Sequence, residues 1–128
     1  MARQYDSSDH RPENGVLQAQ ISEAVVRLLA ERTGRGPTKA RTTISRDLVV
    51  VVLQDSLTTG ELFLAGSDRA EQVLDTRRAY QDSMRADYVA AIEALTDRTV
   101  AAFMSGNHIE PDLAAEIFVL EPQGDPKA

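Results

Sequence analysis

Apolar and polar residues alternate with helical spacing in the first part of the chain. Over residues 13–34, apolar residues recur three and four positions apart, with polar residues mostly between them. This is the pattern of an amphipathic helix. The stripe consists of Leu17, Ile21, Ala24, Val25, Leu28 and Leu29. Asn14 is a good cap for the start of this helix, and Gly34 suits the left-handed position that ends one.

Two strands are predicted after a turn at residues 34–37. The first, residues 40–44, is β-branched and half polar, so we expect one of its faces to contact solvent. The second, residues 48–53, is apolar at every position. A strand exposed on one side alternates apolar and polar residues, so this one should be covered on both faces. Either helices on both sides or a second subunit on one side would cover it. Asp47 is the residue of the intervening turn that suits a positive φ.

The second half of the chain predicts two helices followed by two strands. A short helix capped by Thr58 or Thr59 runs through residue 64, and a long amphipathic helix covers residues 68–96. Strands are predicted at residues 100–104 and 113–120. Residues 105–112 between them are dense in turn-forming types, so we expect a loop there.

The order helix, two strands, two helices, two strands predicts an α+β fold. Its helices should pack on a mainly antiparallel four-stranded sheet. At 128 residues the chain is one domain. We place this domain at residues 13–122. The polar residues 1–12 should form a disordered tail and residues 123–128 a flexible one.

Composition and charge exclude several function classes. The chain has no cysteine, so it has no disulfide or thiolate metal site. A net charge of −6 and few aromatic residues argue against nucleic acid as a partner, although basic residues gather over residues 32–46. The longest strictly apolar run is residues 48–53, far too short to span a membrane. The N-terminus does not read as a secretory signal, so we expect a cytoplasmic protein.

The segment GRGPTK, residues 34–39, has the composition of a phosphate-binding loop but not its context. Such a loop follows a strand and opens a helix, whereas these glycines close a helix and precede a strand. The pattern favours a helix end and a tight turn. Arg35, Lys39 and Arg41 remain candidates for binding a small anion through their side chains. Arg77 joins them because it lies near the apolar stripe of the long helix.

The loop predicted at residues 105–112 supplies two further candidates, Asn107 and His108. His108, Glu110 and Asp112 would be enough for three metal ligands. Exposed loops, however, contain these residue types for turn formation alone. We therefore expect no metal and no cofactor.

The residues that catalysis would need are few. His108 is the only histidine in the predicted domain, and no nucleophile-elbow pattern surrounds Ser105. Glu116 and Glu121 lie on or at the end of a strand, where we expect both to be solvated. We predict no catalytic residue and no enzyme activity.

Several short motifs occur in a fixed order along the chain. They are GRGPTKAR at residues 34–41, VVVL at 50–53, LTTGE at 57–61, RRAY at 77–80, FMSGNH at 103–108 and EIFVL at 116–120. In this ordered set the chain resembles the MpsC family, named for the C component of a sodium-translocating, membrane-potential-generating system of bacteria. The resemblance covers about residues 15–122. It implies a small accessory component linked to membrane energisation and inorganic-carbon uptake, and it supplies no catalytic residue.

The leading hypothesis is an accessory or regulatory interaction module that docks on a protein partner. That partner would belong to an ion- or inorganic-carbon-handling membrane transport complex. The alternative is a sensor of small anions or nucleotides that uses Arg35, Lys39, Arg41 and Arg77. We also predict a homodimer, because the strand at residues 48–53 is apolar on both faces and a small sheet exposes its edges.

Overall fold

The computed structural model describes residues 12–37 and 39–123. Its elements are α1 (Pro12–Thr33), β1 (Lys39–Ser45), β2 (Leu48–Gln54), α2 (Thr59–Gly66), α3 (Ala70–Thr96), β3 (Val100–His108) and β4 (Leu113–Leu120). This order confirms the predicted α+β fold. Apart from Pro12 and Gln123, the two predicted tails lie outside the described residues.

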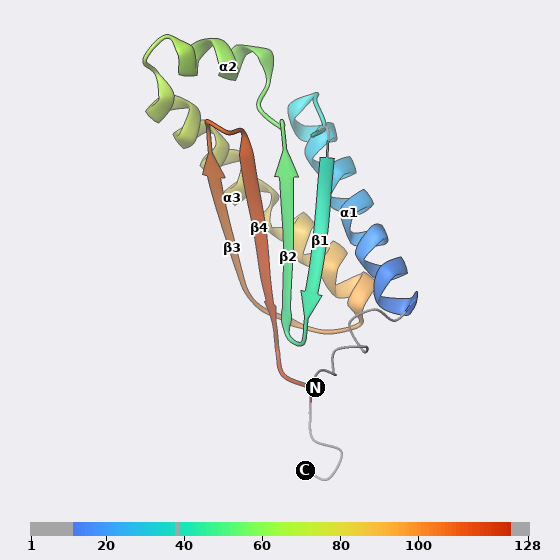
Figure 1. Cartoon of the computed structure of the whole chain (residues 1–128). Helices are drawn as coiled ribbons and strands as arrows, with labels where there is room; N and C mark the ends of the chain where they lie inside the picture. Colours follow the sequence, from blue (N-terminus) through green and yellow to red (C-terminus); the bar gives the residue numbers. More distant parts are fainter. Residues whose placement is uncertain (1–11, 38, 124–128) are drawn as a thin grey trace, which may run out of the picture.

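The four strands form one antiparallel sheet in the order β1-β2-β4-β3. The apolar strand β2 is therefore central, between β1 and β4, and β1 and β3 are the edges. Both long helices, α1 and α3, lie against the same face of the sheet (Figure 1). The short helix α2 follows β2 in the chain and lies beyond the edge of the sheet where β2 ends (Figure 1). The sequence did not reveal this sheet order, because strands adjacent in space need not be adjacent in sequence.

The core lies between the sheet and the two long helices. It contains Ile21, Val25 and Leu29 from α1, Met84, Tyr88 and Ile92 from α3, and Val49, Val51, Leu53, Phe103, Ala114, Phe118 and Leu120 from the strands. The rings of Tyr88 and Phe103 have centroids 5.9 Å apart, and those of Phe103 and Phe118 lie 5.0 Å apart. Every second residue of each central strand thus points into one helix-covered layer.

The first helix differs slightly from its prediction. It begins at Pro12, two residues before Asn14, in keeping with the preference of proline for the first turn. Its end is as predicted, since Gly34 has a φ of +78° and its N–H donates to the carbonyl oxygen of Ala30 at 2.9 Å. Glycine adopts this conformation without a steric cost.

The turn between β1 and β2 differs from the prediction. Arg46, not Asp47, has the positive φ, at 56°. Asp47 is fixed by other contacts, because its carboxylate accepts a hydrogen bond from Arg98 and its carbonyl oxygen accepts one from the N–H of Leu120. These long-range contacts hold Asp47 in place, while Arg46 takes the left-handed conformation of the turn.

The strand β3 is longer than predicted and extends to His108. The loop expected at residues 105–112 is wrong for its first half, and only residues 109–112 form the turn. Ser105 and Asn107 remain in the strand because their side chains bond to groups on β4 and α3. Tertiary contacts thus override the turn propensity of these residues.

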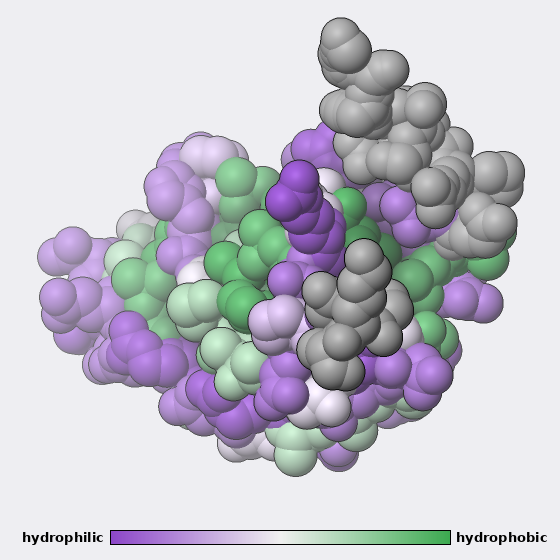
Figure 2. Space-filling view, turned by 90° about the horizontal axis from the view of Figure 1, so that it is seen from below, coloured by the Kyte–Doolittle hydropathy of each residue, from purple (hydrophilic) through white to green (hydrophobic). Residues whose placement is uncertain are grey.

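The face of the sheet opposite α1 and α3 carries no helix among the described residues (Figure 1). We call it the open sheet face. Its central residues are Leu48, Val50 and Val52 of β2, Ala115, Ile117 and Val119 of β4, Ala102, Met104 and Gly106 of β3, and Arg41 and Thr43 of β1. Within the described chain, helices on both sides of β2 are therefore excluded. Figure 2 looks at the lower end of the strands, where hydrophobic residues gather in the middle of the molecule with hydrophilic residues around them.

Candidate functional site

The buried guanidinium of Arg77 anchors the segment that leads into α2. Its side chain is 3% exposed. Nη2 donates to the hydroxyl oxygen of Ser56 at 2.8 Å, and Nη1 lies 3.4 Å from Oε1 of Glu61. Because hydrogen bonds to charged groups are stronger than neutral ones, this cluster ties α3 to the start of α2.

The helix α2 is also capped at its N-terminus. The hydroxyl oxygen of Thr58 accepts from the N–H of Glu61 at 3.1 Å, and Oε1 of Glu61 accepts from the N–H of Thr58 at 2.8 Å. This reciprocal capping box satisfies two backbone donors that would otherwise lack partners. In addition, the N–H of Leu57 donates to the carboxylate of Asp112 at 3.0 Å. An eight-residue helix is marginal alone, so these contacts hold it in place.

The anchored helix presents three consecutive apolar residues to solvent. Leu62, Phe63 and Leu64 are 48%, 73% and 38% exposed, and we call them the α2 apolar tip. A shallow hollow of about 420 Å³ lies beside Leu62. Its walls are Arg35, Asp55, Leu62, Ile109, Glu110, Pro111 and Asp112. Carboxylates therefore outnumber guanidinium groups in that hollow by three to one.

Two of the other predicted basic residues, Lys39 and Arg41, lie apart from the α2 anchor. Lys39 and Arg41 are exposed on β1, where they line a hollow of about 40 Å³ with Val52 and Gln54. Neither Arg35 nor Arg77 lines this hollow. Nη2 of Arg35 instead donates to the carbonyl oxygen of Asp55 at 3.0 Å. The structure thus brings two of the four predicted arginine and lysine side chains together.

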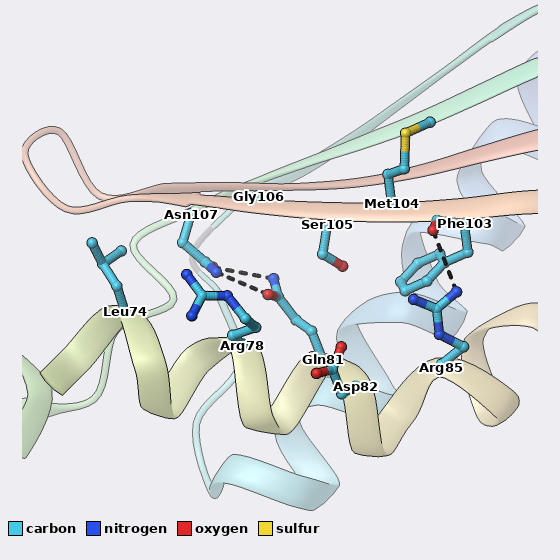
Figure 3. A pocket seen from close by; sticks show the side chains of 10 residues that line it. All are labelled: Leu74, Arg78, Gln81, Asp82, Arg85, Phe103, Met104, Ser105, Gly106 and Asn107. Atoms are coloured by element: carbon cyan, nitrogen blue, oxygen red, sulfur yellow. Dashed lines mark hydrogen bonds between the residues drawn. The ribbon is translucent and has the colours of Figure 1, made fainter. Parts of the chain in front are cut away.

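A groove of about 400 Å³ runs between α3 and the edge strand β3 (Figure 3). Its walls are Leu74, Arg78, Gln81, Asp82 and Arg85 from α3, and Phe103, Met104, Ser105, Gly106 and Asn107 from β3. Gln81 and Asn107 form a two-way amide pair across it, with N···O distances of 3.1 and 2.8 Å. Nη1 of Arg85 donates to the carbonyl oxygen of Phe103 at 3.3 Å.

Beneath this groove lies Glu116 of β4, which is 1% exposed. Its carboxylate bonds to the hydroxyl of Ser105 and to Nε2 of Gln81, the latter at 3.1 Å. Burial raises the pKa of Glu116 to about 7, although the hydrogen bonds from Ser105 and Gln81 and the charge of Arg77 partly oppose this. The prediction that Glu116 is solvated is therefore wrong.

Two signals in the sequence point to this buried network, although the prediction missed it. On β4, Glu116 shares its parity with the core residues Ala114, Phe118 and Leu120. On α3, the buried residues are Val73, Arg77, Gln81, Met84, Tyr88 and Ile92, and their spacing of three and four includes both polar members. A polar residue that keeps the core periodicity is buried and needs a partner.

The loop candidates are placed differently from each other. Asn107 belongs to the network beneath the groove, whereas His108 is exposed at the end of β3. Nδ1 of His108 lies 2.8 Å from the carbonyl oxygen of Pro111 and is its hydrogen-bond donor. Within residues 12–37 and 39–123, no group of three histidine or acidic side chains is arranged to hold a metal ion.

The chain matches the model of one protein family over residues 13–122. That family is described as the Na⁺-translocating membrane potential-generating system, MpsC. The chain belongs to the MpsC family. No curated protein and no solved structure matched it.

The motifs that carry the MpsC resemblance coincide with the contacts described above. Residues 57–61 contain the capping box of α2, and residues 77–80 begin with Arg77. Residues 103–108 and 116–120 contain Ser105, Asn107 and Glu116. In the described part of this family member, no helix is long and apolar enough to cross a membrane.

Proposed function

We propose that this MpsC-family chain is an accessory or regulatory module that docks on a protein subunit of the membrane system for which its family is named. The α2 apolar tip would form the contact. The observation that carries this proposal is the exposure of Phe63, 73% of which faces solvent on a helix fixed by the buried Arg77. The module would act on the cytoplasmic side and as a homodimer.

A fixed apolar helix is well suited to docking. Contiguous exposed apolar residues cost solubility and are typical of interaction surfaces. Aromatic residues such as Phe63 are enriched at the centres of protein interfaces. Because the Arg77 anchor and the capping box already order α2, little conformational entropy is lost when a partner binds.

The charges around the tip favour a basic protein partner over a lipid surface. Asp55, Glu110 and Asp112 lie in the hollow beside Leu62. Carboxylates repel the anionic lipids of the cytoplasmic leaflet. They attract lysine and arginine, which are in excess in the cytoplasmic loops of membrane proteins. We therefore infer a partner surface with an apolar patch flanked by basic side chains.

The alternative of an anion or nucleotide sensor has less support from the geometry. The hollow between Lys39 and Arg41 has a volume of about 40 Å³, which is space for about one or two water molecules. Arg77 donates its hydrogen bonds to Ser56 and Glu61 inside the molecule. Docking through α2 is the better supported function.

Affinity capture from the native host tests the docking proposal. The tagged chain would be expressed in that host, captured from detergent-solubilised membranes, and its partners identified by mass spectrometry. We expect the wild-type chain to recover a subunit of a sodium- or bicarbonate-handling membrane complex and Phe63→Ser to lose it.

Val16→Ser is the matched control, because Val16 is 59% exposed on α1, a different element. It should recover the same subunit as the wild type. Recovery of no such subunit by the wild-type chain, or equal recovery by Phe63→Ser, would overturn the proposal.

A further inference from the structure

The open sheet face is an apolar surface that no element covers among the described residues. The residues on it include Val50, Val52, Ile117 and Val119, which are only partly buried, and Leu48 and Met104, which are 40% and 50% exposed. Each of these apolar side chains has same-face neighbours on the paired strands. The face is therefore a continuous apolar surface rather than a set of scattered residues.

We propose that a second copy of this chain packs on the open sheet face, with the two sheets stacked face to face and their strands antiparallel. This deepens the homodimer named in the proposed function by assigning its surface and its geometry. The two copies are related by a two-fold axis that lies between the sheets and runs across the strands. In this arrangement β4 lies over β4 of the other copy.

The relief of the face supports this orientation. One row across the sheet, the hollow row, consists of Arg41, Val52, Ala115 and Gly106. The next row, the ridge row, consists of Thr43, Val50, Ile117 and Met104. A Cβ atom built on Gly106 meets no atom within 4 Å, so the hollow row is open above this glycine.

The proposed axis places the hollow row of each copy over the ridge row of the other. Ile117 and Met104 of one copy then fill the space above Ala115 and Gly106 of the other. The planes of the two sheets are about 10 Å apart. With the axis along the strands instead, ridge would meet ridge and hollow would meet hollow. That alternative leaves a gap at the hollow rows, which close packing disfavours.

The charges are compatible with the same arrangement. Lys39 and Arg41 lie at one end of the edge strand β1, and Thr43 and Ser45 lie at the other. The proposed axis places the cations of one copy over the hydroxyls of the other. No like charges then face each other, and the centre of the interface contains no ionisable group.

The open sheet face is smaller than a standard protein interface. Four strands about 4.8 Å apart and seven residues rising about 3.3 Å each give the face a flat area of about 400 Å². Two copies together cover about 800 Å² of flat area, and the side-chain relief adds to this. Stable complexes bury about 1,200–2,000 Å², so we expect a reversible dimer of modest affinity.

Light scattering on purified protein tests the surface. We expect the wild-type mass to rise from monomer to dimer across the micromolar range. Ile117→Lys and the milder edge variant Met104→Glu should remain monomeric at the highest concentration, with circular dichroism of the wild type. Phe63→Lys is the control, because it removes an exposed apolar residue outside the open sheet face, and it should still dimerise.

Cross-linking tests the orientation of the two sheets. Because the chain has no native cysteine, each introduced cysteine is the one thiol that can react. A short bismaleimide is added to mixtures of single-cysteine variants. Ala115→Cys should link efficiently to Ile117→Cys and poorly to Val52→Cys. Preferential linkage to Val52→Cys would overturn the antiparallel arrangement, because β4 would then lie over β2.

The remaining outcomes separate this inference from the docking proposal. A wild-type chain that is monomeric throughout, or an Ile117→Lys variant that still dimerises, would overturn the sheet-face dimer. A monomeric wild type that nevertheless captures its membrane subunit through Phe63 would leave docking intact. A dimer that captures nothing would overturn docking alone.

Discussion

The guanidinium of Arg77 donates a hydrogen bond of 2.8 Å to the hydroxyl oxygen of Ser56, and this bond joins α3 to the segment between β2 and α2. Neither residue is more than 3% exposed. The same guanidinium is paired with Glu61, which caps α2. Arg77 is therefore one of the contacts that fix the position of the α2 apolar tip.

Replacement of Arg77 should destabilise the protein strongly. Arg77→Met leaves the buried carboxylate of Glu61 without its partner, and loss of one member of a buried ion pair costs about 3–5 kcal/mol. The free energy of unfolding from urea titration measures this. Arg77→Met/Glu61→Gln should recover part of the loss, because the introduced amide is neutral and its oxygen can still accept from the N–H of Thr58.

Arg78→Met is the control on the same helix. Its ion pair with Asp75 is exposed, with 67% and 73% of the two side chains in solvent. Such pairs contribute less than about 1 kcal/mol. If Arg77→Met and Arg78→Met unfold with equal free energies, the anchoring role of Arg77 is wrong.

The contribution of the α2 capping box to the free energy of unfolding should be measurable separately from that of Arg77. Thr58→Ala removes the acceptor for the N–H of Glu61, and the loss of such a cap costs about 1 kcal/mol. Thr59→Ala, at the first helical residue and exposed, should change the free energy of unfolding by less than about 0.5 kcal/mol. A larger effect from Thr59 than from Thr58 would contradict the assigned cap.

Glu116 should make stability depend on pH. Its pKa is raised from 4.5 to about 7 in the folded state, so below about pH 4.5 the carboxyl is protonated in both states and its contribution to stability is fully present. As pH rises through about 7, the unfolded state loses the proton first and this stability is lost, by about 3 kcal/mol in total. Chemical denaturation from pH 4 to pH 8 follows the loss.

Glu116→Gln should abolish this component. The amide is neutral at every pH and can still bond to Ser105 and Gln81. The variant should therefore become more stable relative to the wild type, in free energy of unfolding, as pH rises. The difference in unfolding free energy between the two proteins isolates Glu116 from the other carboxylates. Glu121→Gln, at an exposed position, serves as control. A difference that stays constant from pH 4 to pH 8 would contradict the raised pKa.

Two neighbouring valines on β2 should respond differently to the same substitution. Val51 is fully buried against the helices, whereas Val50 points to the open sheet face. Val51→Thr buries an unsatisfied hydroxyl and should cost about 1–3 kcal/mol at any protein concentration. Val50→Thr should have little effect in dilute solution and should weaken dimerisation at high concentration. Thermal unfolding at low and high concentration, with light scattering, distinguishes the two.

Local patterns were sufficient for most of the fold. The spacing of apolar residues located the helices and strands, and Gly34 located the end of α1, because each of these signals is physical and local. The site was harder to predict. Arg77 stood out from its helix, but its partners Ser56 and Glu61 lie 21 and 16 residues away along the chain.

The predictions of a loop from residue 105 and of a solvated Glu116 failed for the same reason. Ser105 and Asn107 have turn propensity, and Glu116 is charged, so each residue considered alone predicts exposure. Together with Gln81 they satisfy one another inside the molecule. Such mutual satisfaction becomes visible only when the sheet order places β3 and β4 side by side under α3.

The location of α2 beyond one end of the strands has a consequence for stoichiometry (Figure 1). An antiparallel pair of sheets carries its two α2 helices at opposite ends. The proposed dimer would therefore present one α2 apolar tip at each end, and each tip would bind a separate partner molecule. In that arrangement the dimer would gain no avidity on a single complex, but it would tether two membrane complexes to each other and set the distance between them.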